Sequence, residues 1–248
     1  MADPRLPPEP RTYRTRMFRE GLVGFQVTVK ETDLMILAER DLTAEVRDLV
    51  FQERRQLETY IQQHPEFLTT LTPWPSDPFA PPVVRDMIEA GAKAGVGPMA
   101  AVAGALAARV GQGLLPFSGE VIVENGGDIF LHLTRPATVS LYAGRSPLSY
   151  RVGLRITPDP QPAWGVCTSS GTVGHSLSLG RADAACVVAP DAALADACAT
   201  ALGNRVASAS DIDAALKWLE DIPGVTGAVI IVGERLGAWG KLEVVPLT

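Results

Sequence analysis

Two segments of this sequence have the pattern of helices, yet they consist almost entirely of small residues. The first begins at Gly97-Pro98 and continues as MAAVAGALAA toward Gly111. The second, DAALADACATALG, covers residues 191–203, and Asp191 and Gly203 suit its two ends. A helix with so little side chain on every face does not suit a surface, so we expect the second to be buried. The first lets a backbone or a ligand approach closely.

Strands and helices follow one another in blocks rather than in strict alternation. The first half predicts a β-hairpin over Gly21–Glu39, a helix from Thr43 to His64, a connector that buries Trp74 and Phe79, and a helix over Pro82–Gly95. The second half predicts a helix at 210–221 and strands at 121–123, 129–131, 138–142, 151–156, 165–168, 185–189, 228–232 and 241–245, the last two as a hairpin. This order favours an α+β fold, with mixed or antiparallel sheets packed with helices, over a Rossmann arrangement.

The length suits one large domain or two intimately packed subdomains. Of the 248 residues, 46% are hydrophobic, which is enough for a sizeable core. We therefore divide the chain into an extended N-terminal arm, 1–20, and a single domain, 21–248. The net charge of -6 argues against a nucleic-acid partner. The clustered arginines of the arm are expected to be solvated: Arg11, Arg14, Arg16 and Arg19.

Neither export nor membrane insertion is predicted. The N-terminus, MADPRLPPEPR, lacks the apolar stretch of a signal peptide, and the longest apolar run, Val96–Ala108, is too short to span a bilayer. Cys167, Cys186 and Cys198 match no metal or redox motif and lie among small apolar residues, so we expect buried free thiols. These features predict a soluble protein of the reducing cytoplasm.

Glu124-Asn125-Gly126-Gly127-Asp128 is the first candidate site. The double glycine permits positive φ, so a tight hairpin turn is the simpler interpretation, and turn chemistry alone favours it. The functional interpretation is a loop whose backbone N–H groups, flanked by a carboxylate and an amide, bind a phosphate or the polar edge of a ring.

A polar loop at 168–175 is the second candidate. Its hydroxyl residues, glycines and histidine are Thr168, Ser169, Ser170, Gly171, Thr172, Gly174 and His175. Such a loop can cradle a phosphate, although it lacks the lysine of a P-loop. His175 lies among Gly and Ser rather than on an apolar face, which leaves catalytic and structural roles equally open. A Ser–His hydrolase is a weaker interpretation, because no G-x-S-x-G turn is present.

Asp196 and Thr200 form the third candidate. Their spacing puts a carboxylate and a hydroxyl on one face of the alanine-rich segment 191–203. If Asp196 is buried, its charge needs a partner, and the segment contains no Lys or Arg. A hard divalent cation such as Mg²⁺ would satisfy it. The alternative, slightly favoured by the segment alone, is an Asp that reaches solvent or a backbone N–H.

These elements, taken in order, resemble those of the ApbE family of FAD-dependent protein flavinyltransferases. The chain is most similar to an uncharacterised branch of that superfamily with stretches like GVGPMAAVAGALA and ENGGDIFL. Members carry a small-residue helix, a Gly-Gly loop ending in Asp or Asn, a Ser-Gly loop leading to His, and an Ala-Asp-Ala…Thr-Ala helix. The counterparts here are Gly97–Arg109, Asn125–Asp128, Ser169–His175 and Ala195–Ala201.

The resemblance implies an ApbE-like fold with its site between two subdomains, where FAD binds together with Mg²⁺. Asp196 and Thr200 match the family's side-chain magnesium ligands, His175 matches its histidine, and Gly126 and Gly127 match the loop close to the flavin nucleotide. The other nucleotide-binding residues would be Asn125, Asp128, Ser169, Ser170, Gly171 and Thr172. The implied reaction transfers FMN to a protein acceptor, and a homo-oligomer is left open.

Departures from the family pattern separate two functional hypotheses. The family's helix carries a lysine before a glycine and an aspartate one turn later, where this sequence has Ala103-Gly104 and Ala108. The family's histidine segment continues into Asp-Pro-x-Thr-Gly, where this one reads Ser178-Leu179-Gly180-Arg181. One hypothesis is therefore a Mg²⁺-dependent FMN transferase or an enzyme that cleaves the FAD pyrophosphate. The other is a flavin- or nucleotide-binding protein that has lost the transferase chemistry.

Overall fold

The structure, a computed structural model, describes residues 12–161, 163–171 and 180–247. Its strands are β1 (Val23–Val29), β2 (Thr32–Ala38), β3 (Val121–Asn125), β4 (Asp128–His132), β5 (Ala137–Ser140), β6 (Val152–Ile156), β7 (Ala163–Ser169), β8 (Ala184–Ala189), β9 (Gly227–Val232), β10 (Arg235–Gly240) and β11 (Glu243–Pro246). Its α-helices are α1 (Thr43–Gln63), α2 (Pro82–Ala94), α3 (Val102–Leu114), α4 (Ala192–Asn204) and α5 (Ile212–Leu219). Its 3-10 helices are η1 (Thr12–Arg16), η2 (Pro65–Leu68), η3 (Pro98–Ala101) and η4 (Ala209–Asp211).

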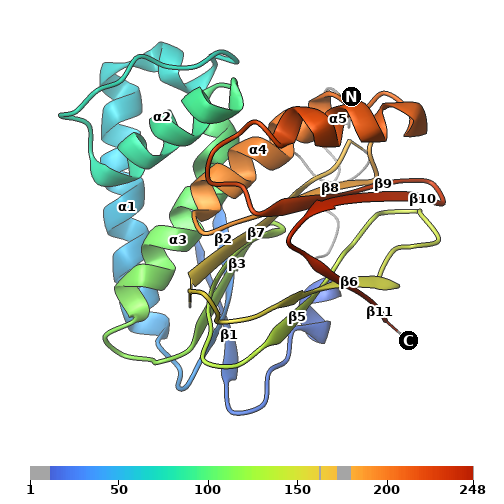
Figure 1. Ribbon diagram of the computed structural model, residues 1–248. Helices are drawn as coiled ribbons and strands as arrows, with labels where there is room; N and C mark the ends of the chain where they lie inside the picture. Colours follow the sequence, from blue (N-terminus) through green and yellow to red (C-terminus); the bar gives the residue numbers. More distant parts are fainter. Residues whose placement is uncertain (1–11, 162, 172–179, 248) are drawn as a thin grey trace.

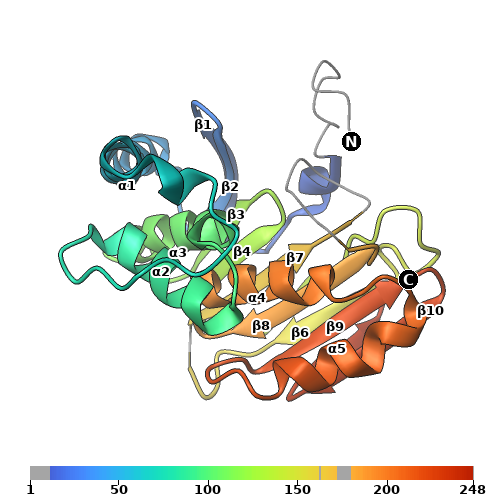
Figure 2. The ribbon, with the colours of Figure 1, turned by 90° about the horizontal axis from the view of Figure 1, so that it is seen from above.

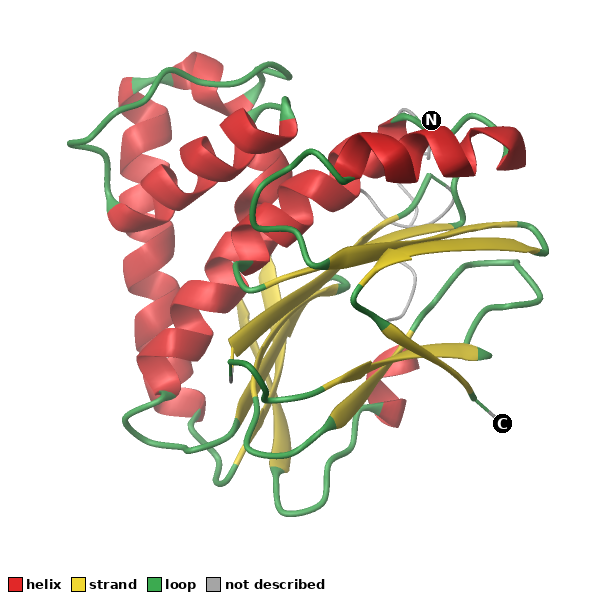
Figure 3. Ribbon diagram, viewed as in Figure 1, coloured by secondary structure: helices red, strands yellow, loops and turns green. Residues whose placement is uncertain are grey.

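The elements form three layers. Eight strands make one sheet in the order β1-β2-β3-β4-β7-β8-β9-β10, and three make a second, β11-β6-β5. Every pairing among the described strands is antiparallel. The α-helices lie on one face of the large sheet and the small sheet lies on the other (Figures 1 and 3). This arrangement confirms the predicted α+β class.

Each face of the large sheet has its own core. One core lies between the helices and the sheet and includes Phe130, whereas the other lies between the two sheets and includes Leu131 and Leu154. Neighbouring residues of a strand point to opposite faces, so Phe130 and Leu131 of β4 enter different cores. The central strands are consequently apolar on both sides, and a polar residue within them needs a partner from another element.

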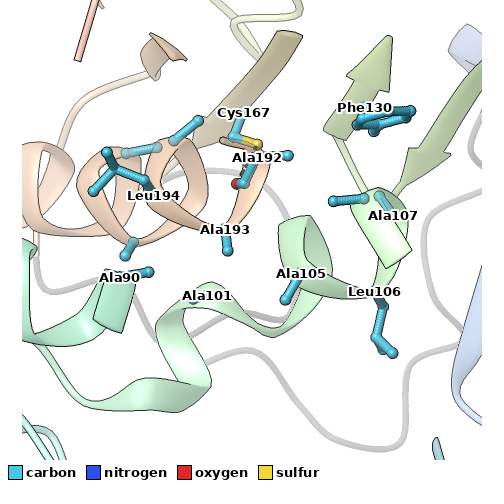
Figure 4. Close-up of a cluster of buried hydrophobic side chains, with 14 of the residues drawn as sticks. Ala90, Ala101, Ala105, Leu106, Ala107, Phe130, Cys167, Ala192, Ala193 and Leu194 are labelled. Carbon is cyan, nitrogen blue, oxygen red and sulfur yellow. Dashed lines mark hydrogen bonds between the residues drawn. The ribbon is translucent and has the colours of Figure 1, made fainter. Parts of the chain in front are cut away.

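Helix α4 is buried, as its composition predicts. From Ala192 to Ala199 every residue is buried, and α4 packs against α2, α3 and α5 as well as β7 and β8. Seen from above, α4 crosses the large sheet with α2 and α3 on one side and α5 on the other (Figure 2). Figure 4 shows Ala192 beside Cys167 of β7, with Ala193 on the side of α4 that faces Ala105.

The contact between α3 and α4 depends on a glycine. A Cβ atom added to Gly104 would lie 2.2 Å from the carbonyl oxygen of Ala192 and 2.8 Å from the Cβ of Asp196. No side chain fits there, because such distances are well inside van der Waals contact. The small-residue pattern of α3 thus serves the close backbone approach that the sequence predicts, and it places Asp196 against the first turn of α3.

Helix boundaries differ from the predictions by a few residues. Asp191 is the N-cap of α4, as predicted, but Gly203 lies inside that helix. Helix α1 begins at Thr43, as predicted, whereas α5 begins at Ile212, two residues after its predicted start. These shifts reflect local hydrogen bonds that compete closely with one another.

The proline-rich connector and the C-terminus also differ from the predictions. Trp74 donates a hydrogen bond to the hydroxyl of Tyr60 and is partly buried, but Phe79 is 95% exposed. The predicted terminal hairpin is wrong, because β9 pairs with β10 and the last strand, β11, pairs with β6 in the small sheet. A turn at Gly233, with φ of 59°, brings β10 back directly after β9.

The arginines before β1 that the structure describes are not all solvated. Arg14 is only 8% exposed and forms ion pairs with Glu124 and Asp33, and Arg19 pairs with Glu120. The expectation of a solvated arm is therefore wrong at Arg14 and Arg19. The reason is a set of acidic residues on β2 and β3 or directly before β3, which the local sequence of the arm does not reveal.

The three cysteines are buried free thiols, as predicted. In the described part of the chain no single helix has the length and hydropathy needed to cross a membrane. The bent pair formed by residues 82–94 and 98–114, which meet at 105°, meets these criteria only when the two helices are counted together.

Candidate functional site

The Gly-Gly turn joins β3 to β4 as a tight hairpin. Asn125 pairs with Asp128, and Gly126 and Gly127 have φ of 69° and 105°. The backbone N–H of Gly127 donates to the Oε1 atom of Glu124 over 2.7 Å. The hairpin interpretation is thus confirmed. It is compatible with ligand binding, because two successive glycines leave the backbone of the turn accessible.

The end of this hairpin meets the beginning of α3. The Nδ2 atom of Asn125 donates to the carbonyl oxygen of Ala103 over 3.1 Å. The Oδ1 atom of Asp128 accepts the backbone N–H of Thr168 on β7 over 3.3 Å. Asn125 and Asp128 are each 9% exposed. The first and last residues of the predicted loop are therefore held by α3 and β7, on the helix-covered side of the sheet.

Asp196 reaches the same place from α4. It is 8% exposed, and its Oδ2 atom accepts the backbone N–H of Gly104 over 2.8 Å. This donor is one of the N–H groups that the first turn of a helix leaves unpaired, where the helix dipole also favours a negative charge. The structure thus provides the backbone N–H partner that the sequence left open. The second carboxylate oxygen remains able to accept a ligand.

The carboxyl groups of Asp128 and Asp196 lie close enough to influence each other. Burial raises the pKa of Asp196 to about 7, against the opposing effect of the N–H groups of Gly104 and Ala103. Burial and then the negative charge of Asp196 raise the pKa of Asp128 well above its ordinary value. Two like charges in a buried site are unfavourable unless a proton or a cation is bound between them.

The polar loop after β7 lies farther along α4. The Oγ atom of Ser169 is 3.5 Å from the position of a Cβ added to Gly203, near the C-terminal end of α4. Gly171 donates its N–H to the carbonyl of Ala182, and Ser169 and Ser170 are half-buried. Thr200, also half-buried, lies one turn beyond Asp196, on the way to this loop. Thr172 and His175 lie outside the described residues.

A pocket of about 560 Å³ opens on the other side of Asn125 and Ala103. Its walls are mainly apolar and come from α1, η2, η3 and α3; they include Leu57, Ile61, Leu68, Met99, Val102 and Leu106. Arg54 lies at the pocket, and it bonds Thr32, Glu31 and Glu58. Leu57 and Ile61 line this pocket from α1. The pocket between that helix and α3 was not predicted, because it depends on how the two pack.

A model of the protein family described as AbpE bacteria matches residues 15–243. The chain belongs to this family. It is 43% identical over 215 residues to a UPF0280 protein of Methanocella arvoryzae, covering 86% of this chain and 87% of that protein. It is 41% identical over 226 residues to a UPF0280 protein of Methanococcus aeolicus, covering 89% and 91%.

The fold of this member of the AbpE family is similar to those of solved ApbE structures. The ApbE protein of Thermotoga maritima superimposes with a TM-score of 0.56 at 13% identity, covering 87% of this chain and 96% of that one. The flavin transferase ApbE of Vibrio cholerae gives 0.52 at 14% identity, covering 88% and 96%. The flavinyl transferase ApbE of Pseudomonas stutzeri gives 0.55 at 13%, covering 90% and 95%. These matches confirm the predicted ApbE-like fold.

Two departures of this member of the AbpE family from the ApbE pattern lie on α3. Ala103, where that pattern has a lysine, contributes its carbonyl oxygen to the amide of Asn125. Ala108, where the pattern has an aspartate, is 8% exposed and packs in the core beneath the helices. Both positions are thus apolar and well accommodated, so no charged side chain is supplied there.

The site offers oxygen donors. Among the described residues, no group of three or more His, Cys, Asp and Glu side chains is close enough to hold a metal ion. Asp196 bonds Gly104, and Asn125, which pairs with Asp128, bonds the preceding Ala103, so both carboxylates lie near the start of α3; the hydroxyl of Thr200 lies one turn further along α4. Hard oxygen donors in small number suit Mg²⁺, which keeps several waters and shares substrate phosphates.

Sequence reasoning missed one part of the site. Glu124 was regarded only as a flank of the turn, but it is 1% exposed and binds Tyr13, Arg14 and Gly127. A signal for this was present in β3, which reads Val-Ile-Val-Glu-Asn: an acidic residue that follows three apolar ones in a buried strand requires a buried donor or cation.

Proposed function

We propose that this protein binds FAD together with Mg²⁺ where the β3–β4 turn meets α3 and α4, and transfers FMN to a hydroxyl group of a protein acceptor. The observation that carries the proposal is the meeting of Asp196 and the Gly-Gly turn at the first turn of α3, where Asp196 accepts the N–H of Gly104 and Asn125, the strand partner of the buried Asp128, bonds Ala103. A buried pair of like charges is a typical place for a cation, and the surrounding N–H groups favour phosphates.

Asp196 and Thr200 would hold Mg²⁺, together with a backbone carbonyl near Val102. When bound, Mg²⁺ neutralises charge on the diphosphate of FAD. Asp196 suits this role because burial raises its pKa, so that a cation is the partner that keeps it ionised at neutral pH. Thr200 adds a neutral oxygen donor on the same face of α4.

The nucleotide would lie along the turn and the pocket. Asn125 borders both, since it ends β3, bonds Ala103 and lines the 560 Å³ pocket. That volume lies within the range of sites for small molecules and cofactors, and its apolar wall suits a planar ring. Gly126, Gly127 and Asp128 would contact the polar part of the nucleotide, with Ser169, Ser170, Gly171 and Thr172 near the phosphates.

The reaction itself is a phosphoryl transfer. The acceptor oxygen forms a bond to the phosphorus of the FMN moiety, the bond from that phosphorus to AMP breaks, and the hydroxyl proton leaves to a base. We assign this proton to His175, since the imidazole of histidine is the side chain that most often acts as a general base. The products are the flavinylated acceptor and AMP. Water in place of the acceptor would release free FMN and AMP.

A second candidate is a flavin-binding protein without transfer chemistry. The observation that favours it is the apolar character of Ala103 and Ala108, where the ApbE pattern carries a lysine and an aspartate. Loss of charged groups at a site removes stabilisation of the transition state more than it removes binding. This candidate keeps the pocket, the turn and Asp196.

One titration separates these functions. FAD is added with and without Mg²⁺ to the full chain with an acceptor peptide containing Ser and Thr, and AMP, free FMN and flavinylated peptide are measured. Flavinylated peptide with AMP is the expected result, free FMN with AMP indicates pyrophosphate cleavage, and tight binding without AMP indicates the second candidate. Absence of binding would reject the proposal.

The chain offers a matched control for this titration. Asp196→Asn removes the charge at the proposed site. Asp191→Asn removes the same charge from the exposed N-cap of the same helix, where Asn is an equally good cap. We expect only the first variant to lose the Mg²⁺ dependence of FAD binding.

A further inference from the structure

The Gly-Gly turn is attached to a buried ionic cluster at its base. Glu124, the residue before Asn125, is 1% exposed. Its Oε1 atom accepts the N–H of Gly127 over 2.7 Å and the hydroxyl of Tyr13 over 2.6 Å. Its Oε2 atom accepts the Nε of Arg14 over 2.6 Å. One carboxylate thus links the conformation of the turn to two residues that precede it by more than 100 positions.

The two terminal nitrogens of the Arg14 guanidinium are also hydrogen-bonded. Its Nη1 atom donates to the Oδ2 of Asp33 over 2.8 Å, and its Nη2 atom to the carbonyl oxygen of Asp33 over 2.7 Å. Burial lowers the pKa of Arg14, but the neighbouring carboxylates outweigh this and raise it. The guanidinium therefore stays charged and bridges β2 to β3 through Asp33 and Glu124.

Tyr13 is fixed by ring stacking as well as by its hydroxyl. Its ring lies 6.5 Å from that of Tyr142, at an interplanar angle of 24°. Tyr142 in turn stacks on Tyr150 at 5.1 Å. The 3-10 helix η1 is thus held between β3 and the segment that follows β5, and its two functional groups have little freedom.

The negative charge of Glu124 lies beside the turn and would repel an anionic ligand if Arg14 did not neutralise it. Glu124 already contributes to raising the pKa of Asp128. Without Arg14, the carboxylate of Glu124 would be a buried and uncompensated charge beside the turn. Glu124 would then turn toward solvent to hydrate this charge, and that movement breaks the hydrogen bond that the N–H of Gly127 donates to it.

We propose that Tyr13 and Arg14 are positioning residues for nucleotide binding, which act through Glu124 to set the Gly126-Gly127 turn and to neutralise the charge beneath it. This inference rests on the proposed function, since it assumes that the turn contacts a nucleotide. The N-terminal segment, which precedes the turn by more than 100 residues, would therefore take part in forming the site.

The same strand provides a matched control. Arg19, also from the segment before β1, forms an ion pair with Glu120 at the opposite end of β3, and their side chains are 10% and 6% exposed. Arg14→Met and Arg19→Met therefore each break a well-buried ion pair between the N-terminal segment and one end of β3. Arg14→Met also removes the pair with Asp33, and Arg19→Met also removes the bonds to the carbonyls of Arg135 and Pro136. Only the first pair touches the Gly-Gly turn.

The test measures two quantities for each variant of the full chain: the Kd for FAD in the presence of Mg²⁺, and amide hydrogen exchange over residues 124–128 without ligand. We expect Arg14→Met to weaken FAD binding by about tenfold or more, as loss of an outer-shell partner commonly does. Exchange at Gly127 should become faster. Arg19→Met should lower Tm comparably but leave both quantities close to those of the parent.

Tyr13→Phe provides a milder variant that removes one hydrogen bond and keeps the ring stack. We expect it to weaken FAD binding by roughly two- to tenfold, and it decides the matter if Arg14→Met does not fold. Parent-like FAD binding and parent-like Gly127 exchange in Arg14→Met and Tyr13→Phe would overturn the inference, as would equal losses in Arg19→Met. If the parent binds no flavin nucleotide, the proposed function fails, and the exchange at Gly127 alone decides whether the cluster holds the turn.

Discussion

Replacing Asp196 by Asn should make the metal-free protein more stable at pH 8 while removing its response to Mg²⁺. Asn has the same shape, and its side-chain oxygen can still accept the N–H of Gly104. The substitution therefore removes the buried charge and little else. In the metal-free protein, the substitution removes the free-energy cost of burying an uncompensated charge. In the presence of Mg²⁺, it removes a metal ligand and weakens the metal site.

The magnitude follows from the pKa of Asp196. Burial raises this pKa from 3.8 to about 7, and each unit corresponds to about 1.4 kcal/mol. The ionised carboxylate therefore destabilises the fold by about 4 kcal/mol at most, which for a chain of this size corresponds to roughly 8–16 °C in Tm. The neutral amide also has a burial cost, so the measured gain should fall below this limit.

The sign of the pH dependence can be stated in advance. The folded-state pKa of Asp196 lies above its unfolded value, so the native state binds the proton more tightly. Its stabilising contribution is complete below the unfolded pKa, near 4, and is lost as the pH rises through about 7. Asp196→Asn should thus match the parent near pH 4 and exceed it increasingly up to pH 8.

The assay is thermal unfolding across this pH range in a chelating buffer, repeated at pH 8 with Mg²⁺ and FAD. Asp191→Asn, the exposed N-cap variant, should track the parent throughout. Two results would refute the reasoning. A variant less stable than the parent by the same amount at every pH would show that the charge of Asp196 is not destabilising. A variant that retains the full shift with Mg²⁺ would place the metal elsewhere.

Other substitutions test the remaining parts of the site. Thr200→Val should reduce the Mg²⁺-dependent thermal shift less than Asp196→Asn does, and the two losses should not add, because both residues would act on one ion; additive losses would count against a shared ion. Gly127→Val should abolish FAD binding in a fluorescence titration, since its φ of 105° is strained for a β-branched residue; parent-like affinity would mean that the turn is only a hairpin. His175→Ala should remove transfer, measured as AMP release, with little change in Tm; a large Tm loss with full activity would indicate a structural histidine. Glu53→Gln should raise Tm above that of the parent at pH 8 but not at pH 4, because burial raises the pKa of Glu53 and its Oε2 atom has no hydrogen-bond partner among the described residues. A variant with the same Tm as the parent at both pH values would contradict this.

Much of the fold was predictable from the sequence because it depends on neighbours along the chain. The alternation of Phe25 and Val27 predicts the first hairpin, and the double glycine at 126–127 predicts the turn between β3 and β4. The absence of a polar face on 191–203 predicts a buried helix, and α4 is buried. In each case the pattern and the structure involve the same few residues, so no knowledge of packing is required.

The candidate site depended on the tertiary structure. Asp196 meets Gly104 across 92 positions, and Arg14 meets Glu124 across 110. Local pattern carries no information about such pairs, because they are set by sheet order and by the approach of α3 to α4. The exposure of Phe79 and the pairing of β11 with β6 were missed for the same reason. The sequence by itself determined which residues must be buried and which backbone turns are possible. Only the tertiary structure decided which buried charges share one environment, since that depends on distances between elements far apart in the chain.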